Sequence, residues 1–151
     1  MPPGVPNYVT PQGLEQLHQE HAELEASRSK AEAARDDEAE RTRQLTILNS
    51  QLSALNARIS SARVIDPKDQ PKDEVRFGAT VTLQTLSGGK TGFTRTFTIV
   101  GVDEASVEKG LIAFVAPIAQ AVQGLKEGEK ATLQFGRNKE EVLVKEIRYT
   151  Y

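Results

Sequence analysis

Four acidic residues lie close together near position 38, in the middle of a long helix-forming stretch, and they form the one cluster in the chain with a clear chemical use. They are Asp36, Asp37, Glu38 and Glu40. Carboxylates at an exposed turn can hold a hard cation, since Mg²⁺ commonly takes one or two protein carboxylates and fills its shell with water and substrate oxygens. Asp36 and Asp37 are the expected ligands of such a weakly held ion. A run of acids is more often a solvated segment, and the residues alone leave both interpretations open.

Basic residues flank the acids, and their role is equally open. Arg35, Arg41 and Arg43 could contact phosphates as point charges along a groove. Alternatively, the basic residues of this stretch pair with acids three or four positions away on a helix. His18 and His21 are three residues apart, but a metal site needs further ligands that this stretch does not supply, so we interpret both as structural.

Other catalytic sites find no support in the sequence. The chain has no cysteine, which excludes thiolate nucleophiles and cysteine zinc sites. It has no nucleophile elbow with a following histidine and no phosphate-binding glycine loop, and Ser87-Gly88-Gly89-Lys90 lacks the required spacing. We therefore expect a protein that is not itself an enzyme.

Composition narrows the class of protein further. The 151 residues carry 19 Lys and Arg against 21 Asp and Glu, a balance that argues against binding nucleic acid by bulk charge. No run of 18 apolar residues is present, and residues 1–8 lack the basic and apolar regions of a signal peptide. These features predict a cytoplasmic protein that does not contact a membrane.

The acids must be positioned by the first half of the chain, which has helix-forming composition. An apolar residue recurs at alternating intervals of three and four, as in a coiled coil. A single helix over the whole stretch would be about 75 Å long and would leave this seam bare, so we expect the chain to fold back at about residue 36 or 37. Residues 1–9 are expected to be a flexible tail and residues 10–65 the hairpin. The seam comprises Leu14, Leu17, His21 and Leu24, then Leu45, Leu48, Leu52, Leu55, Ile59 and Ala62.

The second half has the composition of strands and turns. Residues 66–74 contain two prolines and are expected to be a linker, and residues 75–151 to form a mostly antiparallel sheet with one short helix. Alternation places Phe93, Phe97 and Ile99 on the inner face of one strand. The whole chain is therefore predicted to have an α+β fold.

Several stretches of the second half resemble bacterial transcript-cleavage factors of the Gre family. The resemblance is specific here and looser in the hairpin. The stretches are Ala62–Asp66, Phe77-Gly78-Ala79-Thr80-Val81, Thr98-Ile99-Val100-Gly101-Val102-Asp103-Glu104-Ala105, Leu111-Ile112 and Ala116-Pro117-Ile118-Ala119-Gln120-Ala121-Val122-Gln123-Gly124.

This resemblance implies a fold and a function. It implies a coiled-coil hairpin and an FKBP-like C-terminal domain that docks on RNA polymerase at the rim of the secondary channel. The hairpin tip then lies beside the polymerase's catalytic Mg²⁺ and the nascent RNA, where the acids help to retain a second Mg²⁺, so that the polymerase cleaves its own backtracked transcript. We expect a monomer with no stably bound cofactor. The docking residues that the resemblance implies are Asp103, Glu104, Ala105, Pro117, Ile118, Ala119 and Gln120.

The tip departs from the family's pattern of Asp-x-x-Glu-Asn-Ala-Glu-Tyr. That pattern falls on residues 34–41, where Ala34 replaces the first Asp, Asp37 the Glu and Arg41 the aromatic residue, and Ala39-Glu40 is kept. The sequence therefore leaves two outcomes open, stimulation of cleavage or inhibition of the polymerase without cleavage. A prolyl isomerase and a coiled-coil adaptor that pairs between chains are further alternatives.

Overall fold

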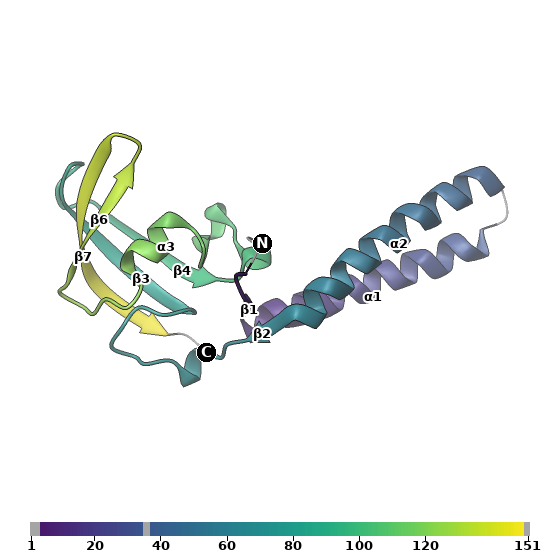
Figure 1. Ribbon diagram of the computed structural model, residues 1–151, viewed down its shortest axis with the longest axis horizontal. Helices are drawn as coiled ribbons and strands as arrows, with labels where there is room; N and C mark the ends of the chain where they lie inside the picture. The colour runs from purple at the N-terminus through teal and green to yellow at the C-terminus, as the bar shows by residue number, and fades with distance from the viewer. Residues whose placement is uncertain (1–3, 35–36, 150–151) are drawn as a thin grey trace.

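A helical hairpin projects from a small β-sheet domain in the computed structural model, which describes residues 4–34 and 37–149 (Figure 1). Helix α1 (Pro11–Ala33) runs outward and helix α2 (Glu38–Ser61) returns beside it. The chain reverses between Ala33 and Glu38, so the predicted fold-back is confirmed and one uninterrupted rod is excluded. Arg35 and Asp36 lie outside the described residues.

Local signals explain where both helices begin. The Thr10 side chain accepts a hydrogen bond from the Gly13 amide, and Pro11 occupies the first helical position, where no amide hydrogen is needed. Asp37 caps α2 in the same way by accepting from the Glu40 amide at 3.2 Å. The two caps thus fix the start of each arm.

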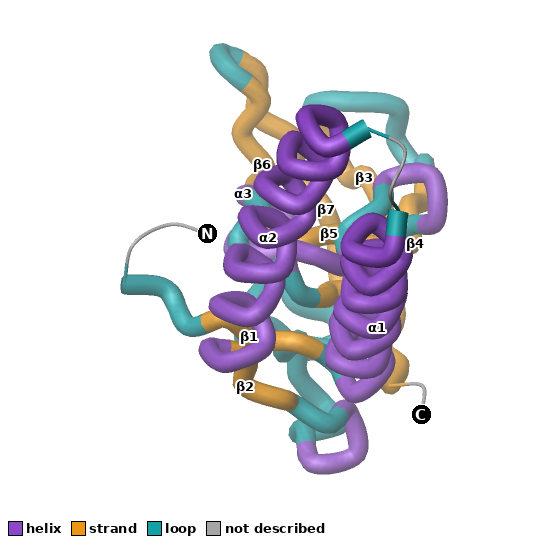
Figure 2. The backbone as a smooth tube through the Cα atoms, turned by 90° about the vertical axis from the view of Figure 1, so that its right-hand side faces the viewer, coloured by secondary structure: helices purple, strands orange, loops and turns teal. Residues whose placement is uncertain are grey.

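The apolar seam between the arms is tightest at the base of the hairpin. Leu17, Leu52 and Leu55 are buried there, whereas Leu48 is half-buried and Ile47 is 52% exposed nearer the tip. Figure 2 shows the two arms side by side along their length. The hairpin is therefore held mainly from its base, as the spacing predicts.

A two-stranded parallel sheet closes the base of the hairpin. Strand β1 (Asn7–Val9) pairs with strand β2 (Ala62–Val64), which directly follows α2. The prediction of a flexible tail is wrong for Asn7–Val9, because these residues form this strand. Successive side chains of a strand point to opposite faces, and both faces of β1 are covered. Val9 packs into the core of the hairpin, while Tyr8 packs against the core of the other domain. Strand β1 therefore joins the two parts of the molecule.

The C-terminal domain is a five-stranded sheet in the order β5-β4-β3-β7-β6. Neighbouring strands are antiparallel except β4 and β5, which are parallel. One short helix, α3, packs beside β6, and the α+β prediction is confirmed. The elements are the 3₁₀ turn η1 (Pro67–Asp69), β3 (Ala79–Ser87), β4 (Thr94–Val100), the 3₁₀ turns η2 (Val102–Glu104) and η3 (Val107–Lys109), β5 (Leu111–Ala113), α3 (Pro117–Val122), β6 (Lys130–Phe135) and β7 (Asn138–Tyr149).

The core of this domain follows the predicted alternation with one exception. Phe97 and Ile99 are buried as expected, but Phe93 is 50% exposed. Phe93 precedes the first residue of β4, so the strand's inner face does not include it. Its ring instead lies 5.6 Å from the Arg95 guanidinium, a cation–π contact at the surface.

The segment 66–74 is fastened to the sheet domain. Pro67 is buried against Gly78, where an added Cβ would lie 3.2 Å from the proline ring. The Gln70 amide group donates to the Phe77 carbonyl at 2.9 Å. The backbone of Glu74 pairs with that of Lys126 in an isolated antiparallel β-bridge. The segment therefore connects the two parts without behaving as a free spacer.

Candidate functional site at the hairpin tip

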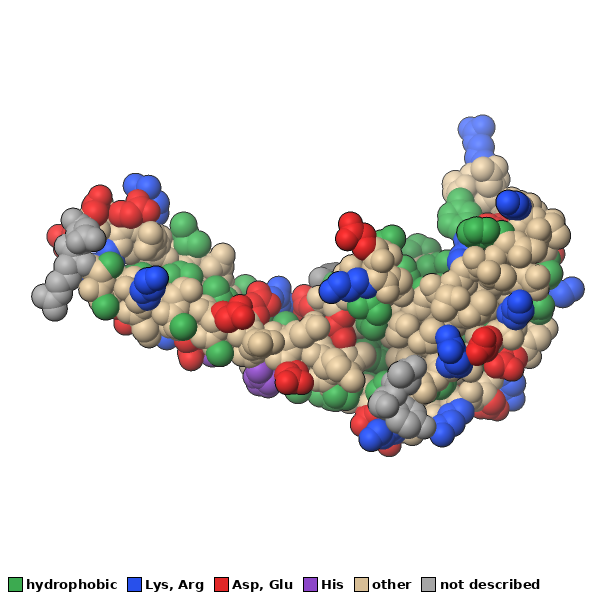
Figure 3. Space-filling view, turned by 180° about the vertical axis from the view of Figure 1, so that it is seen from behind, with side chains coloured by type: hydrophobic (Ala, Val, Ile, Leu, Met, Phe, Trp, Pro, Cys, Tyr) green, Lys and Arg blue, Asp and Glu red, His purple; other side chains and the backbone are tan. Residues whose placement is uncertain are grey.

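Exposed carboxylates gather at the free end of the hairpin, as the space-filling view shows (Figure 3). Asp37 and Glu38 are both exposed at the start of α2. One oxygen of Asp37 accepts from the Glu40 amide, and its other oxygen accepts no hydrogen bond from the described residues. Asp36, the remaining acid of the predicted cluster, lies outside the described residues.

The basic residues beside the acids make local contacts. The Arg43 guanidinium lies 3.0 Å from the Glu40 carboxylate, and the two side chains are 69% and 45% exposed. The Arg41 guanidinium donates to the Ala34 carbonyl at 3.1 Å and so links the ends of the two arms. Arg35 lies outside the described residues. Arg41 thus stabilises the turn, whereas Arg43 is held only by a surface ion pair, which is weak.

Two exposed carboxylates of the described tip are hard oxygen donors. Within residues 4–34 and 37–149, no group of three or more potential metal ligands is present. Asp37 and Glu38 offer two hard oxygen ligands, which is the number that Mg²⁺ commonly takes from one protein.

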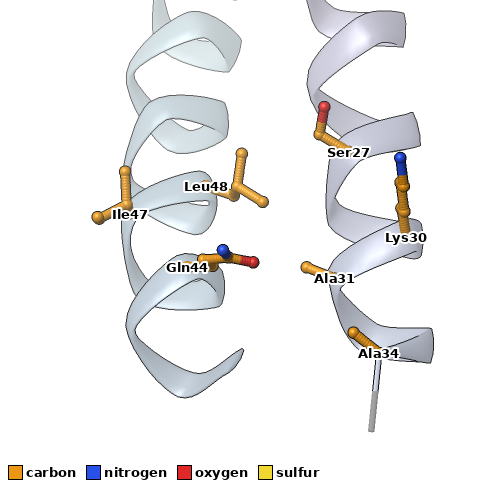
Figure 4. A pocket seen from close by; sticks show the side chains of 7 residues that line it. All are labelled: Ser27, Lys30, Ala31, Ala34, Gln44, Ile47 and Leu48. Carbon is orange, nitrogen blue, oxygen red and sulfur yellow. The ribbon is translucent and has the colours of Figure 1, made fainter. Parts of the chain in front are cut away.

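A shallow apolar groove lies between the arms just behind the tip (Figure 4). It encloses about 420 Å³ and is lined by Lys30 and Ala31 of α1, by Ala34 just after that helix, and by Ile47 and Leu48 of α2, among others. Ile47 was not part of the predicted seam, since it lies one position before Leu48. The three- and four-residue spacing therefore does not predict that Ile47 lines this groove.

Two of the predicted docking residues in the β4–β5 connection contact the hairpin. The Glu104 carboxylate accepts from the Thr10 and Gly101 amides at 3.1 and 3.2 Å. Asp103 lies 3.7 Å from the Arg58 guanidinium of α2. Ala105 is exposed. Asp103 and Glu104 therefore have a contact within the chain that the sequence did not indicate.

The other predicted docking residues lie on α3 and differ in accessibility. Pro117 and Gln120 are exposed, Ile118 is half-buried, and Ala119 is 2% exposed and belongs to the core. Only the first three can contact a partner directly. Pro117 and Ile118 also line an apolar cavity of about 240 Å³ together with Ala121, Leu133, Gln134 and Phe135.

The aromatic cluster in this domain offers little room for a ligand. The ring centroids of Tyr8, Phe77 and Phe114 lie 5.3–5.9 Å from one another. The cavity beside them measures about 50 Å³, far below the several hundred Å³ typical of ligand pockets. No helix in the described parts of the chain is long and apolar enough to cross a membrane.

Comparison with known proteins identifies the family. Residues 70–149 match the family model described as the C-terminal part of transcription elongation factor GreA/GreB. The chain is 41% identical over 101 residues to transcription elongation factor GreA of Aliarcobacter butzleri, covering 66% of this chain and 61% of that relative. It is 31% identical over 144 residues to GreA of Desulfovibrio desulfuricans, covering 87% and 86%.

The solved structure of GreA factor homolog 1 (Gfh1) from Thermus thermophilus aligns with 93% of this chain and 97% of its own length, at 19% identity and a TM-score of 0.43. The match of the family model to more than half of the sequence, together with the relative that aligns along nearly the whole chain, places this protein in the GreA/GreB family of transcription elongation factors.

Proposed function

We propose that this protein binds bacterial RNA polymerase, inserts its hairpin into the secondary channel and stimulates cleavage of backtracked transcripts at the polymerase's own active site. The observation that carries the proposal is the pair of exposed carboxylates, Asp37 and Glu38, at the far end of the hairpin. Helix α1 has 23 residues, so the tip lies about 35 Å beyond the base. A slender projection of this length can reach a buried reaction centre that the bulk of the protein cannot enter.

Asp37 and Glu38 are the residues that would share Mg²⁺ with the polymerase. In a two-metal site the ions stabilise the attacking and leaving oxygens of the displacement. Asp37 is held in one orientation by its bond to the Glu40 amide, so its second oxygen is presented in a defined place. The Glu38 side chain makes no hydrogen bond or ion pair with the described residues and can adjust to the geometry of the polymerase. The protein's own contribution is thus to position two carboxylates, not to perform the reaction.

The basic residues of the tip support contact with nascent RNA. Arg43 is bound to Glu40 only by an exposed ion pair, which contributes little in water and exchanges readily for another anion. A phosphate oxygen is a suitable alternative partner for a guanidinium. Arg41 contributes indirectly, because it keeps the two arms together through the Ala34 carbonyl.

Docking falls to the sheet domain, where Pro117, Ile118 and Gln120 are accessible on α3. The apolar cavity beside them offers a surface that a partner side chain can cover. The hairpin already pairs its two seams within one chain, so we expect a monomer in solution.

A second candidate function is inhibition of the polymerase without cleavage. It is favoured by the turn itself: Ala34 provides no carboxylate where the family's tip has its first Asp, and Arg41 places a cation beside that position. A tip with fewer well-placed acids could occupy the reaction centre and block it.

Adding the protein to backtracked elongation complexes in the presence of Mg²⁺ tests both functions. RNA length on a gel reports cleavage, and addition of the next nucleotide reports inhibition. The matched variants are Asp37→Asn and Glu38→Gln, which remove charge, and asparagine still caps a helix. We expect the wild type to shorten the RNA and the double variant to bind the polymerase without doing so.

The outcomes separate the candidates. Slower nucleotide addition with uncut RNA, relieved in the double variant, supports the inhibitor. Absence of polymerase binding overturns both proposals. Loss of binding in the double variant alone would mean that the acids dock the protein and do not act on the metal.

A further inference from the structure

The carboxylate of Glu104 lies against the first turn of α1, although the two are 94 positions apart in the chain. One oxygen accepts from the amides of Thr10 and Gly101, at 3.1 and 3.2 Å. The other accepts from the Thr10 hydroxyl. The same hydroxyl oxygen accepts from the Gly13 amide at 3.0 Å. One side chain of the sheet domain is thus bonded directly to the residue that starts the hairpin.

Glycine at position 13 makes this approach possible. A Cβ at position 13 would lie 2.3 Å from the carboxyl carbon of Glu104, a distance that real Cβ atoms essentially never show. Gly13 is buried inside the first turn of α1, where glycine has no conformational advantage. Close packing by Glu104 therefore explains why a helix-weakening residue occupies this place. A negative group at a helix N-terminus is also favoured by the helix dipole.

Two further contacts surround this one. The Arg58 guanidinium lies 3.7 Å from Asp103 and 3.7 Å from Glu20 of α1. Tyr8, whose side chain lies on the face of β1 opposite to that of Val9, packs on Phe114. The ion pairs are long and partly exposed, so they contribute little to rigidity. Glu104 joins Thr10, at the start of α1, to the sheet domain by two hydrogen bonds, and a third bond to the Gly101 amide holds its carboxylate within its own connection.

The orientation of α1 at its base decides where the tip lies. A tilt of about 10° at one end of a helix about 35 Å long moves the other end by about 6 Å. Misplacement of a reacting group by about 1 Å can lower a rate by about 10²-fold.

We infer that Glu104 is a positioning residue, which fixes the direction of the hairpin relative to the docking domain and so places the tip. The inference rests on the proposed function for its effect on cleavage, but the hairpin's direction can be measured in the free protein. Gly13 allows this role because it has no side chain where the Glu104 carboxylate packs.

Distance measurement between two spin labels tests the inference directly. The chain has no cysteine, so cysteines introduced at the exposed positions Thr42 near the tip and Lys145 on β7 are the sole labelling sites. The variants are Glu104→Ala, Gly13→Ala and the two combined, with Glu108→Ala as control, since Glu108 is an exposed acid of the same connection. Circular dichroism verifies that every variant keeps its helices and strands.

We expect one narrow distance distribution in the wild type and the Glu108→Ala control. Glu104→Ala should broaden or shift it by several Å, and so should Gly13→Ala, because the new methyl group displaces the carboxylate. The combined variant should resemble Glu104→Ala, because the clash is then absent. Unchanged distances in both single variants would overturn the inference and leave the contacts of β1 as the sole determinant of direction.

Cleavage assays then connect direction to function. Glu104→Ala should lower the maximal cleavage rate by about 10²-fold, with the concentration for half-maximal effect unchanged, and Glu104→Gln, which keeps one acceptor oxygen, should recover part of the rate. An unchanged maximal rate alongside a shifted distance would overturn the functional part of the inference. If the wild type shows no cleavage, the proposed function fails while the distance measurement still decides the role of Glu104.

Discussion

Replacing Tyr8 by alanine should lower the free energy of unfolding by about 2–3 kcal/mol. Removing a fully buried aromatic side chain costs about 3–5 kcal/mol, and Tyr8 is only half-buried, which reduces that figure. Its ring lies 5.3 Å from Phe114 and 5.9 Å from Phe77, tilted in both cases, and each such pair contributes about 0.5–1.5 kcal/mol beyond burial. The loss should be large because Tyr8 carries the contact of β1 with the sheet domain.

Urea unfolding followed by circular dichroism measures this loss, with Tyr8→Phe as the matched control. The Tyr8 hydroxyl makes no hydrogen bond to the described residues, so phenylalanine should leave the unfolding midpoint nearly unchanged. A loose tail would make Tyr8→Ala neutral within about 0.5 kcal/mol, as for most surface substitutions. That result would refute the packing of β1 between the two domains.

Three further changes probe other contacts. The pKa of Glu140 is lowered, chiefly because Thr85 donates a hydrogen bond to its carboxylate. The charged carboxylate therefore stabilises the fold above the ordinary pKa of 4.5, and this stabilisation is lost as the pH falls through the lowered pKa. Glu140→Gln should flatten the acid side of a plot of unfolding free energy against pH. Gly13→Ala should destabilise the wild type by about 1–3 kcal/mol in thermal unfolding, yet stabilise a Glu104→Ala background by up to about 1 kcal/mol. Asp37→Ala should cost about 1 kcal/mol of helix stability by circular dichroism, and Asp37→Asn much less.

Local patterns were enough to predict most of the architecture. The alternating three- and four-residue spacing predicted the antiparallel hairpin, because an apolar seam on a long helix needs a partner and the second half of the same seam supplies it. Strand β3 alternates strictly, and its inward side chains, including Val81 and Leu83, are fully buried. Both predictions depend on the periodicity of apolar residues along the chain, which the sequence displays directly.

Contacts between distant segments were what the sequence could not display. Asn7–Val9 form a strand only because Ala62–Val64 pair with them, and three prolines before them favour the interpretation of a loose tail. The role of Glu104 depends in the same way on a glycine in another element. Resemblance to a family assigned Asp103 and Glu104 to a partner, whereas their nearest charged and polar neighbours lie within the chain.

The tip combines a structural and a chemical role in one carboxylate, and this determines how its variants must be interpreted. Asp37 caps α2 and would also face the cation, whereas Glu38 follows the cap and its side chain contacts no polar group of the described residues. Loss of activity in Asp37→Ala would therefore combine a frayed helix with a lost charge, since both depend on the same side chain. Asp37→Asn removes the charge and keeps the cap, and Glu38→Gln removes charge where no cap is involved. If these two variants lose the effect on the polymerase while α2 stays folded, the carboxylates act through their charge and not through the shape of the turn.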